Sequence, residues 1–316
     1  MISASHTPDT SRRAARPNAR RLLVSLVGTL GILLGGTSAA APYPPTKPTS
    51  PLLKPEKKAQ VQPVEARIFT GYSAIRPGME LQVAVQFEIK PGWRIYWQNA
   101  GDLPAGATQV KLQAPVGFTV GPPLWSGPKA RRTAAGLVQY IYDRQALVVF
   151  PVKTPEEWAA GDEIELQAEY EWTAENQTTV RGKGTLELVL PLLGVDEPLE
   201  ESADLTELLN LLAELPADAE ELEFEIVHTW SGPELLISAP DAELLTFFPH
   251  ASTEWTLENA GECIEGREQH LRAKIRDLRA GSRKPITGVI AVGKRVKRRV
   301  DWTYFSFKAE RLATDM

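Results

Sequence analysis

Cys263 is the only cysteine among the 316 residues, and its chemistry is the easiest to name. A thiolate can exchange with a disulfide of another protein, but a single cysteine cannot form a disulfide within its own chain. Glu262 and Glu265 lie close to it in sequence, and negative charge disfavours a thiolate. We therefore interpret Cys263 as an inert or partly buried side chain. Exchange with a partner's cysteines through this free thiol is the alternative.

Metal and cofactor chemistry find no support in the sequence. The histidines beyond residue 41 are His228, His250 and His270, and no two of them stand at the spacing of metal ligands. The sequence also contains no Gly-x-Ser-x-Gly motif, phosphate loop or dinucleotide fingerprint. We expect no metal site, no cofactor and no catalytic residue.

A cluster of aromatic residues, Trp93, Tyr96 and Trp97, is the first candidate for binding. If the segment is a strand, Trp93 and Trp97 share one face and Tyr96 points to the other. One of the faces must be core, so we interpret the cluster mainly as packing, with a small-molecule or glycan site as an alternative. Asn99 and Asp102 follow, and we expect their side chains to close a turn by bonding nearby backbone.

The second candidate is a basic run at residues 294–299, from Lys294 to Arg299. Five of its six residues are Lys or Arg, and aromatic residues follow it at 302–305. Such a run can contact an anionic membrane surface or an acidic partner. It is more often a solvated edge strand that charge protects against pairing with another sheet, and we adopt that interpretation.

The elements that must position these residues have the two-residue period of β-strands. Residues 81–89 alternate apolar and polar side chains, a turn follows at 90–92, and residues 93–97 alternate again. We interpret this pair as a hairpin. Further short strands are expected at residues 110–112, 137–142, 146–152, 164–172, 185–190, 224–227, 234–237, 286–292 and 302–307.

One segment has a helical period instead. Leu205, Leu208, Leu209, Leu212 and Leu215 recur at three- and four-residue spacing, and a proline stops the run. The rest of the segment is acidic. The sequence therefore predicts a short acidic helix between two β regions, and the fold class is all-β: two immunoglobulin-like β-sandwich units joined by that helix.

The N-terminus has the features of a bacterial-type secretory signal. Five arginines and one acid precede an apolar run at residues 22–36, and small residues follow at 37–41. We expect cleavage near Ala40 and a periplasmic or secreted protein, with an uncleaved membrane anchor as the alternative. A Pro-rich linker at residues 41–63 would follow. Without residues 1–40, the chain holds 30 bases and 39 acids, a net charge of −9. This charge argues against nucleic acid as a partner.

Residues 91–102 carry a resemblance to a known family. They read Pro-Gly-Trp-Arg-Ile-Tyr-Trp-Gln-Asn-Ala-Gly-Asp, which resembles the motif His-Trp-x-x-Tyr-Trp-x-Asn-Pro-Gly-Asp of the N-terminal periplasmic domain of the thiol:disulfide interchange protein DsbD and its ScsB-type relatives. Later matches keep the family's order: residues 122–128 stand where it has Trp-Pro-x-Pro, and Tyr140-Ile141-Tyr142 where it has Tyr-Gly-Tyr. The resemblance covers residues 64–192 well and residues 222–307 loosely.

The chain departs from the family at its redox centre. The resemblance places the family's cysteine pair at Thr173 and Gln177, and neither of these side chains can form a mixed disulfide. If the transfer is correct, cysteines introduced at both positions should lie on adjacent strands or a connecting turn and form a disulfide.

These observations give one interpretation. The resemblance implies a non-catalytic periplasmic binding or scaffold component linked to thiol–disulfide pathways, with a periplasmic or membrane-associated protein as partner. The residues that it implies for binding are Trp93, Tyr96, Trp97, Asn99, Asp102, Tyr140, Tyr142, Thr173 and Gln177. The expected organisation is a signal peptide at 1–40, the linker at 41–63, a DsbD N-terminal-like sandwich at 64–192, a helical linker at 193–221 and a second β domain at 222–310.

Overall fold

The structure is a computed structural model, and it divides into a unit of residues 1–58 and a unit of residues 59–316. It describes residues 62–103, 106–158, 163–219, 222–239, 242–258, 260–265, 270–277 and 284–310. All of these lie in the second unit. The predicted signal peptide and almost all of the predicted linker lie outside the described residues. No helix within the described residues is long and apolar enough to cross a membrane.

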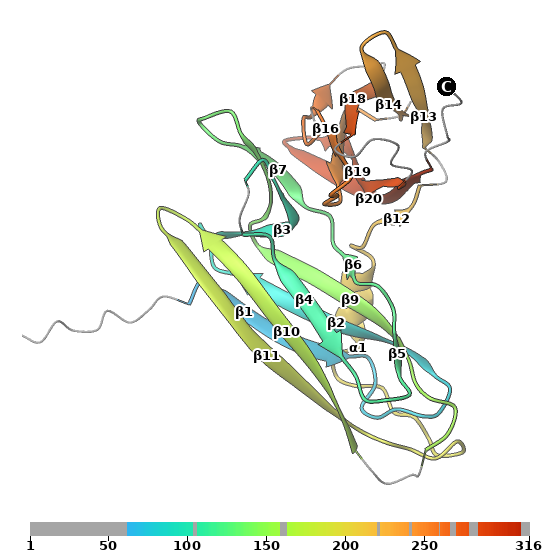
Figure 1. Cartoon of the computed structure of the whole chain (residues 1–316). Coiled ribbons are helices and arrows are strands. Elements are labelled where there is room, and N and C mark those ends of the chain that lie inside the picture. Colours follow the sequence, from blue (N-terminus) through green and yellow to red (C-terminus); the bar gives the residue numbers. More distant parts are fainter. Residues whose placement is uncertain are drawn as a thin grey trace, which may run out of the picture. The chain divides into compact units, whose positions relative to one another are not determined.

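The described residues form four β-sheets, and the first two make one sandwich (Figure 1). The first sheet has the order β1-β2-β9-β5, with β6 also paired to β9. Its strands are β1 (Val64–Thr70), β2 (Glu80–Ile89), β5 (Thr119–Val120), β6 (Leu124–Trp125) and β9 (Gln145–Lys153). The second sheet has the order β11-β10-β3-β8-β7, with β4 also paired to β10. Its strands are β3 (Arg94–Gly101), β4 (Gln109–Gln113), β7 (Lys129–Arg132), β8 (Val138–Tyr142), β10 (Glu163–Glu175) and β11 (Thr179–Pro191).

The other two sheets form the second β region. One has the order β12-β20-β19-β15-β17 and the other β13-β14-β18-β16. Their strands are β12 (Ala217–Asp218), β13 (Glu223–Thr229), β14 (Gly232–Ser238), β15 (Leu244–Pro249), β16 (Trp255–Leu257), β17 (Ile264–Glu265), β18 (His270–Asp277), β19 (Ile286–Val296) and β20 (Arg299–Ala309). The predicted all-β class with β-sandwich units is thus confirmed.

The predicted hairpin of residues 81–97 is wrong. β2 pairs with β1 and β9, whereas β3 pairs with β8 and β10, so the two strands belong to different sheets. Phe87 of β2 and Trp97 of β3 are both fully buried in the same hydrophobic core. Burying two apolar faces against each other across a sandwich outweighs direct pairing of neighbouring strands.

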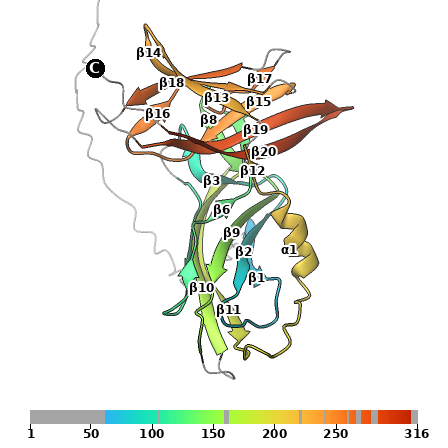
Figure 2. The same ribbon diagram turned by 90° about the vertical axis from the view of Figure 1, so that its right-hand side faces the viewer.

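The helix α1 (Leu205–Leu212) is shorter than the leucine period predicts. Leu208 and Leu211 are buried against Phe69 of β1 and Leu147 of β9, so α1 covers the outer face of the first sheet (Figure 2). Its acidic N-terminal end is explained by Arg67 of β1, which forms ion pairs with Asp204 and Glu207. The helix therefore packs on the first sandwich besides connecting two β regions.

β15 is buried along its whole length. Phe247 packs into the core of the second β region, and its neighbour Phe248 packs into the core of the first sandwich. Successive side chains of a strand point to opposite faces, so β15 has a core on each side. This strand, which carries no polar alternation, was missed in the sequence.

Candidate binding site around Thr173

Thr173 lies near the end of β10 and is only 8% exposed. It faces Arg181 directly in the β10–β11 ladder, and its neighbour Ala174 pairs with Ile95 of β3. Gln177 is exposed in the turn between β10 and β11. The structure therefore buries one of the two positions at which the resemblance places cysteines and leaves the other at the tip of a hairpin.

A cleft of about 350 Å³ adjoins Thr173. Residues from three parts of the chain line it, among them Asn99, Gly106, Gln109, Glu171 and Arg181. Gly106 has φ +107°, and a Cβ there would lie 3.1 Å from both Thr173 Cβ and the Tyr96 ring. Only glycine fits this backbone at this distance, so the segment from β3 to β4 passes closely over Thr173.

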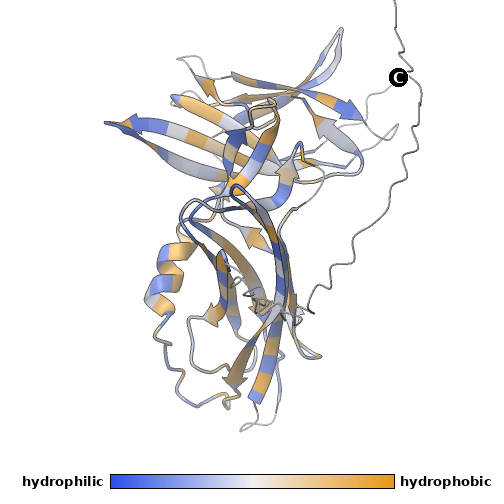
Figure 3. Cartoon of the chain, turned by 90° about the vertical axis from the view of Figure 1, so that its left-hand side faces the viewer, coloured by the Kyte–Doolittle hydropathy of each residue, from blue (hydrophilic) through white to orange (hydrophobic). Residues whose placement is uncertain are grey.

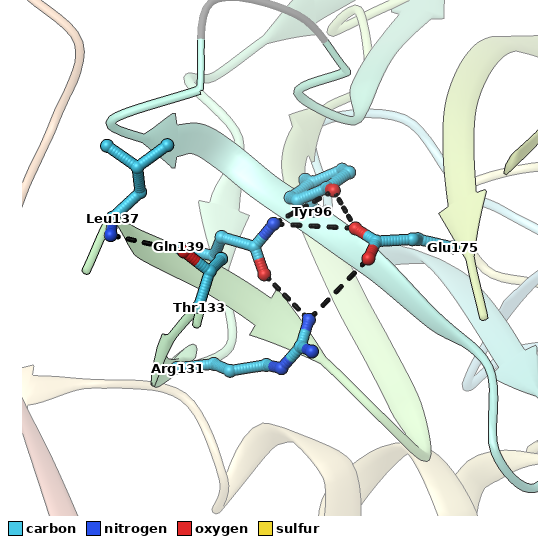
Figure 4. A network of polar contacts seen from close by, with 6 residues as sticks. All are labelled: Tyr96, Arg131, Thr133, Leu137, Gln139 and Glu175. Atoms are coloured by element: carbon cyan, nitrogen blue, oxygen red, sulfur yellow. Dashed lines mark hydrogen bonds and ion pairs between the residues drawn. The ribbon is translucent and has the colours of Figure 1, made fainter. Parts of the chain in front are cut away.

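A polar network lies beside this cleft (Figure 4). The Tyr96 hydroxyl donates a hydrogen bond to Glu175 Oε2, and Gln139 Nε2 donates to the same two oxygens at 3.3 and 3.4 Å. Arg131 donates to Gln139 Oε1 at 2.8 Å, and its Nη1 lies 3.6 Å from Glu175 Oε1. Four strands, β3, β7, β8 and β10, thus contribute one side chain each to a connected group.

The network fixes the charge of its carboxylate. Burial alone would raise the pKa of Glu175, but the Tyr96 hydrogen bond, the Arg94 charge, the Gln139 hydrogen bond and the Arg131 charge lower that pKa below its ordinary value. Burial, followed by the contact with Glu175, raises the pKa of Tyr96. The pair is therefore an anionic carboxylate and a neutral phenol at neutral pH, which is suited to polar recognition.

The aromatic residues of β3 separate as the strand period predicts. Trp97 is fully buried in the core, while Trp93 is partly buried against that core. Tyr96 points to the other face and packs with Ala100 and Ile141. Trp97 thus has a packing role, and only Tyr96 reaches the polar network.

Asn99 bonds nearby backbone at the end of β3, as expected, whereas Asp102 bonds the backbone of the neighbouring strand β8. Asn99 Oδ1 accepts from the Gly101 amide at 3.0 Å, and Asp102 Oδ2 accepts from the Val138 amide at 2.7 Å. Asn99 Nδ2 also donates to the Pro249 carbonyl oxygen at 2.8 Å, which ties β3 to β15. These contacts give both side chains a structural role next to the cleft.

Tyr140 and Tyr142 are both buried in β8. Tyr140 makes edge contacts with Trp97 and Phe248, with ring centroids 6.2 and 5.3 Å apart. The Tyr142 hydroxyl donates to the Ser126 carbonyl oxygen at 2.6 Å, and burial raises the pKa of both tyrosines. Both tyrosines therefore have packing roles, and neither lines the cleft.

Cys263 is exposed, which contradicts the predicted partly buried side chain. Its neighbour Glu262 forms an ion pair with Arg132 of β7, in which Arg132 Nη2 and Glu262 Oε1 are 2.7 Å apart. The short β17 then begins at Ile264, which leaves Cys263 in the connection before that strand. The thiol is thus reachable from outside. In the part of the chain that the structure describes, no three His, Cys, Asp or Glu side chains come close enough to hold a metal ion.

Arg131, Gln139 and Glu175 were missed in the sequence. Arg131 and Gln139 lie on the consecutive paired strands β7 and β8, whereas Glu175 is remote in sequence on β10 and is brought to them only by the fold. One signal was available: Gln139 is a polar residue within β8, whose other four residues are apolar or aromatic and all buried. A polar side chain in such a strand needs a hydrogen-bonding partner.

Comparison with known proteins supports the sequence resemblance. Residues 58–185 match the family described as thiol:disulfide interchange protein DsbD, N-terminal. No curated protein matches the chain.

Solved structures give further matches. The N-terminal periplasmic domain of ScsB from Proteus mirabilis is 14% identical, with 79% of this chain and 94% of that chain covered and a TM-score of 0.49. The reduced DsbD N-terminal domain of Neisseria meningitidis is 18% identical, with 42% and 89% covered and a TM-score of 0.25. A complex of the DsbD and PilB N-terminal domains from Neisseria meningitidis is 21% identical, with 43% and 88% covered and a TM-score of 0.21. The region 58–185 that is similar to the DsbD N-terminal family includes both Thr173 and Gln177 and contains no cysteine.

Proposed function

We propose that this protein is an exported, non-catalytic binding component of a thiol–disulfide pathway, and that its partner contacts the cleft around Thr173. One observation carries the proposal: the only cysteine of the chain is Cys263, outside the region of residues 58–185 that matches the DsbD family. Dithiol exchange needs two thiols that can close a disulfide. The family fold is therefore present without the groups that perform the family's chemistry.

The surroundings of Thr173 support a binding role. The cleft is lined by a carboxylate, Glu171, and a cation, Arg181, and both residues are exposed. Such a mixed polar surface suits a protein partner better than an apolar small molecule. Export rests on the predicted signal at residues 1–40.

The first experiment tests whether the cleft is a binding surface. A photo-crosslinking amino acid is placed at Gln109, which is exposed and lines the cleft, and in a second protein at Gln113. Gln113 is also exposed and lies on the same strand, but about 13 Å further along it. We expect a crosslinked partner at position 109 that is absent at position 113, and that partner should carry a redox-active cysteine pair. Equal crosslinking at both positions, or a partner without such a pair, would contradict the proposal.

The second experiment tests the absence of catalysis. The wild-type protein and Cys263→Ser are compared in the reduction of a disulfide substrate with a limiting dithiol donor. We expect neither protein to accelerate the reaction above the donor alone.

A second candidate function is favoured by the exposure of Cys263. A single accessible thiol can form a mixed disulfide with a partner but has no second thiol in its chain to release that partner. If wild-type protein accelerates the reduction and Cys263→Ser does not, exchange through Cys263 replaces the non-catalytic proposal.

A further inference from the structure

The end of the hairpin formed by β19 and β20 is basic, although the protein as a whole is acidic. Residues 41–316 carry a net charge of −9, yet five of the six residues at 294–299 are Lys or Arg. Lys297 and Arg298 form the exposed turn and make no ion pair with another described residue. Arg299 pairs with Asp301, Nε to Oδ1 at 2.9 Å, so the local charge is only partly compensated.

The basic run does not lie on an edge strand of the sheet, as the sequence predicted, but on the projecting end of two inner strands. In the order β12-β20-β19-β15-β17, both β19 and β20 lie inside the sheet. β15 pairs with β19 only as far as Gly293, and β12 pairs with β20 at Phe305 and Ser306. The basic residues therefore lie where the hairpin extends past its neighbours, on strands that are central in the rest of the sheet.

This extension is a two-stranded projection. Three residue pairs, from Lys294↔Asp301 to Val296↔Arg299, continue the ladder past Gly293 without a third strand in the described chain. At 3.4 Å per residue they carry the turn about 10 Å beyond the last pair of β15 and β19. The hairpin extends past the other strands in Figure 2, and its end is hydrophilic at the left of Figure 3.

The turn itself has an unusual residue. Lys297 has φ +58°, the left-handed conformation that hairpin turns usually assign to Asn or Gly. Beside it, Val296 is 41% exposed. The turn thus places a cation at its apex beside an exposed apolar side chain, and both groups interact favourably with a surface that is anionic and has an apolar interior.

We propose that the tip of the β19–β20 hairpin docks on an anionic lipid surface, with Lys294, Lys297 and Arg298 against the headgroups. A projection of about 10 Å matches the screening length at physiological salt, so the acidic remainder of the protein is held at the distance where its repulsion fades. A long acidic polymer would instead run past the tip and meet that acidic surface. The proposal is independent of the Thr173 cleft.

The test uses sedimentation of the full chain with vesicles of phosphatidylglycerol and phosphatidylcholine, and with vesicles of phosphatidylcholine alone. The variant is Lys297→Asn with Arg298→Gln, which keeps a residue suited to positive φ. The matched control, Lys111→Gln with Lys183→Gln, removes two exposed lysines from β4 and β11. All proteins share residues 22–36, so binding through that apolar run is common to each of them. Circular dichroism verifies that each variant is folded.

Each lipid-facing cation contributes about fivefold to partitioning, so loss of two should weaken binding to anionic vesicles by at least tenfold. The control should bind like the wild type, and added salt should remove the difference. Equal binding of variant and wild type to anionic vesicles would overturn the proposal. An equal loss of binding in the control would also overturn it. Tighter binding of the wild type to polyglutamate than to vesicles at the same charge concentration would identify an acidic macromolecule as the partner instead.

Discussion

At the scale of single residues, the hydrogen bond between Tyr96 and Glu175 is the interaction most open to experiment. Tyr96→Phe removes the hydroxyl while keeping the ring that packs with Ala100 and Ile141. A hydrogen bond to a charged group contributes about 1–2 kcal/mol, and we expect that loss in urea unfolding at pH 7. Tyr72→Phe is the control, because no hydrogen bond of the Tyr72 hydroxyl is present in the described residues.

The same pair predicts a dependence on pH. The pKa of Glu175 is lowered in the folded state, so its contribution to stability is present above the unfolded value of 4.5 and is lost as the pH falls through the folded value. The stability difference between wild type and Tyr96→Phe should therefore be largest above pH 4.5 and shrink below it. A difference that stays constant down to acid pH would show that the hydroxyl acts through packing alone.

At the scale of elements, the register of β10 and β11 contradicts the expectation that cysteines at positions 173 and 177 would form a disulfide. Along β10 the chain advances about 6.6 Å from Thr173 to Glu175. Glu175 pairs with Thr179, so Gln177 lies beyond Glu175 at the tip of the hairpin, at a still larger separation from Thr173. The limit for a disulfide is about 7 Å between Cα atoms. Cysteines at 173 and 177 are thus too far apart, whereas Thr173 and Arg181 are direct partners.

We therefore expect Thr173→Cys with Arg181→Cys, in a Cys263→Ser background, to form an intramolecular disulfide on mild oxidation. Directly opposed residues of an antiparallel pair have Cα atoms about 4.5–5.5 Å apart, within the range of a disulfide. Thiol titration and mass spectrometry would detect the loss of two thiols in a monomer. The pair Thr173→Cys with Gln177→Cys should stay reduced. The reverse result would mean that the ladder is out of register.

The positions of many strands were predictable from the sequence. Alternation located β2 and β10 to within a few residues, and turn residues on either side bounded the apolar run of β9. It could not assign partners: residues 81–89 and 93–97 look like a hairpin, but local alternation says nothing about which sheet a strand joins. β15 was not predicted because it is buried on both faces and its side chains therefore do not alternate between apolar and polar.

The candidate site was predictable only in part. The turn contact of Asn99 follows from local chemistry, because a short polar side chain bonds the adjacent backbone, whereas Asp102 bonds the remote backbone of β8. The group of Tyr96, Gln139 and Glu175 depends on long-range strand pairing, which composition and spacing do not contain. The family resemblance places a cysteine pair at Thr173 and Gln177, and the separation of these two positions in the hairpin does not support that placement.

At the scale of the whole second unit, β15 couples two hydrophobic cores. Phe247→Ala removes a side chain from the core of the second β region, and Phe248→Ala removes one from the core that holds Trp97 and Tyr140. Each should cost about 3–5 kcal/mol, since both side chains are buried. Their positions differ by one residue, which makes them a matched pair.

The two variants should differ in cooperativity. Wild-type unfolding is expected to be one transition, because the cores share a strand. Phe248→Ala should separate the transitions of the two regions, followed by fluorescence of Trp97 against Trp255, while Phe247→Ala should keep them closer together. Coincident transitions in Phe248→Ala would show that the remaining contacts, such as Asn99 to Pro249, are sufficient for coupling.

The exposure of Cys263 has a practical consequence for measuring that coupling. Because the chain has no other cysteine, a maleimide dye added to the native protein attaches at one known position without mutagenesis. That position is next to Glu262, whose ion pair reaches Arg132 of the first sandwich. Single-molecule fluorescence of a dye at this position would report how often the two β regions separate in solution.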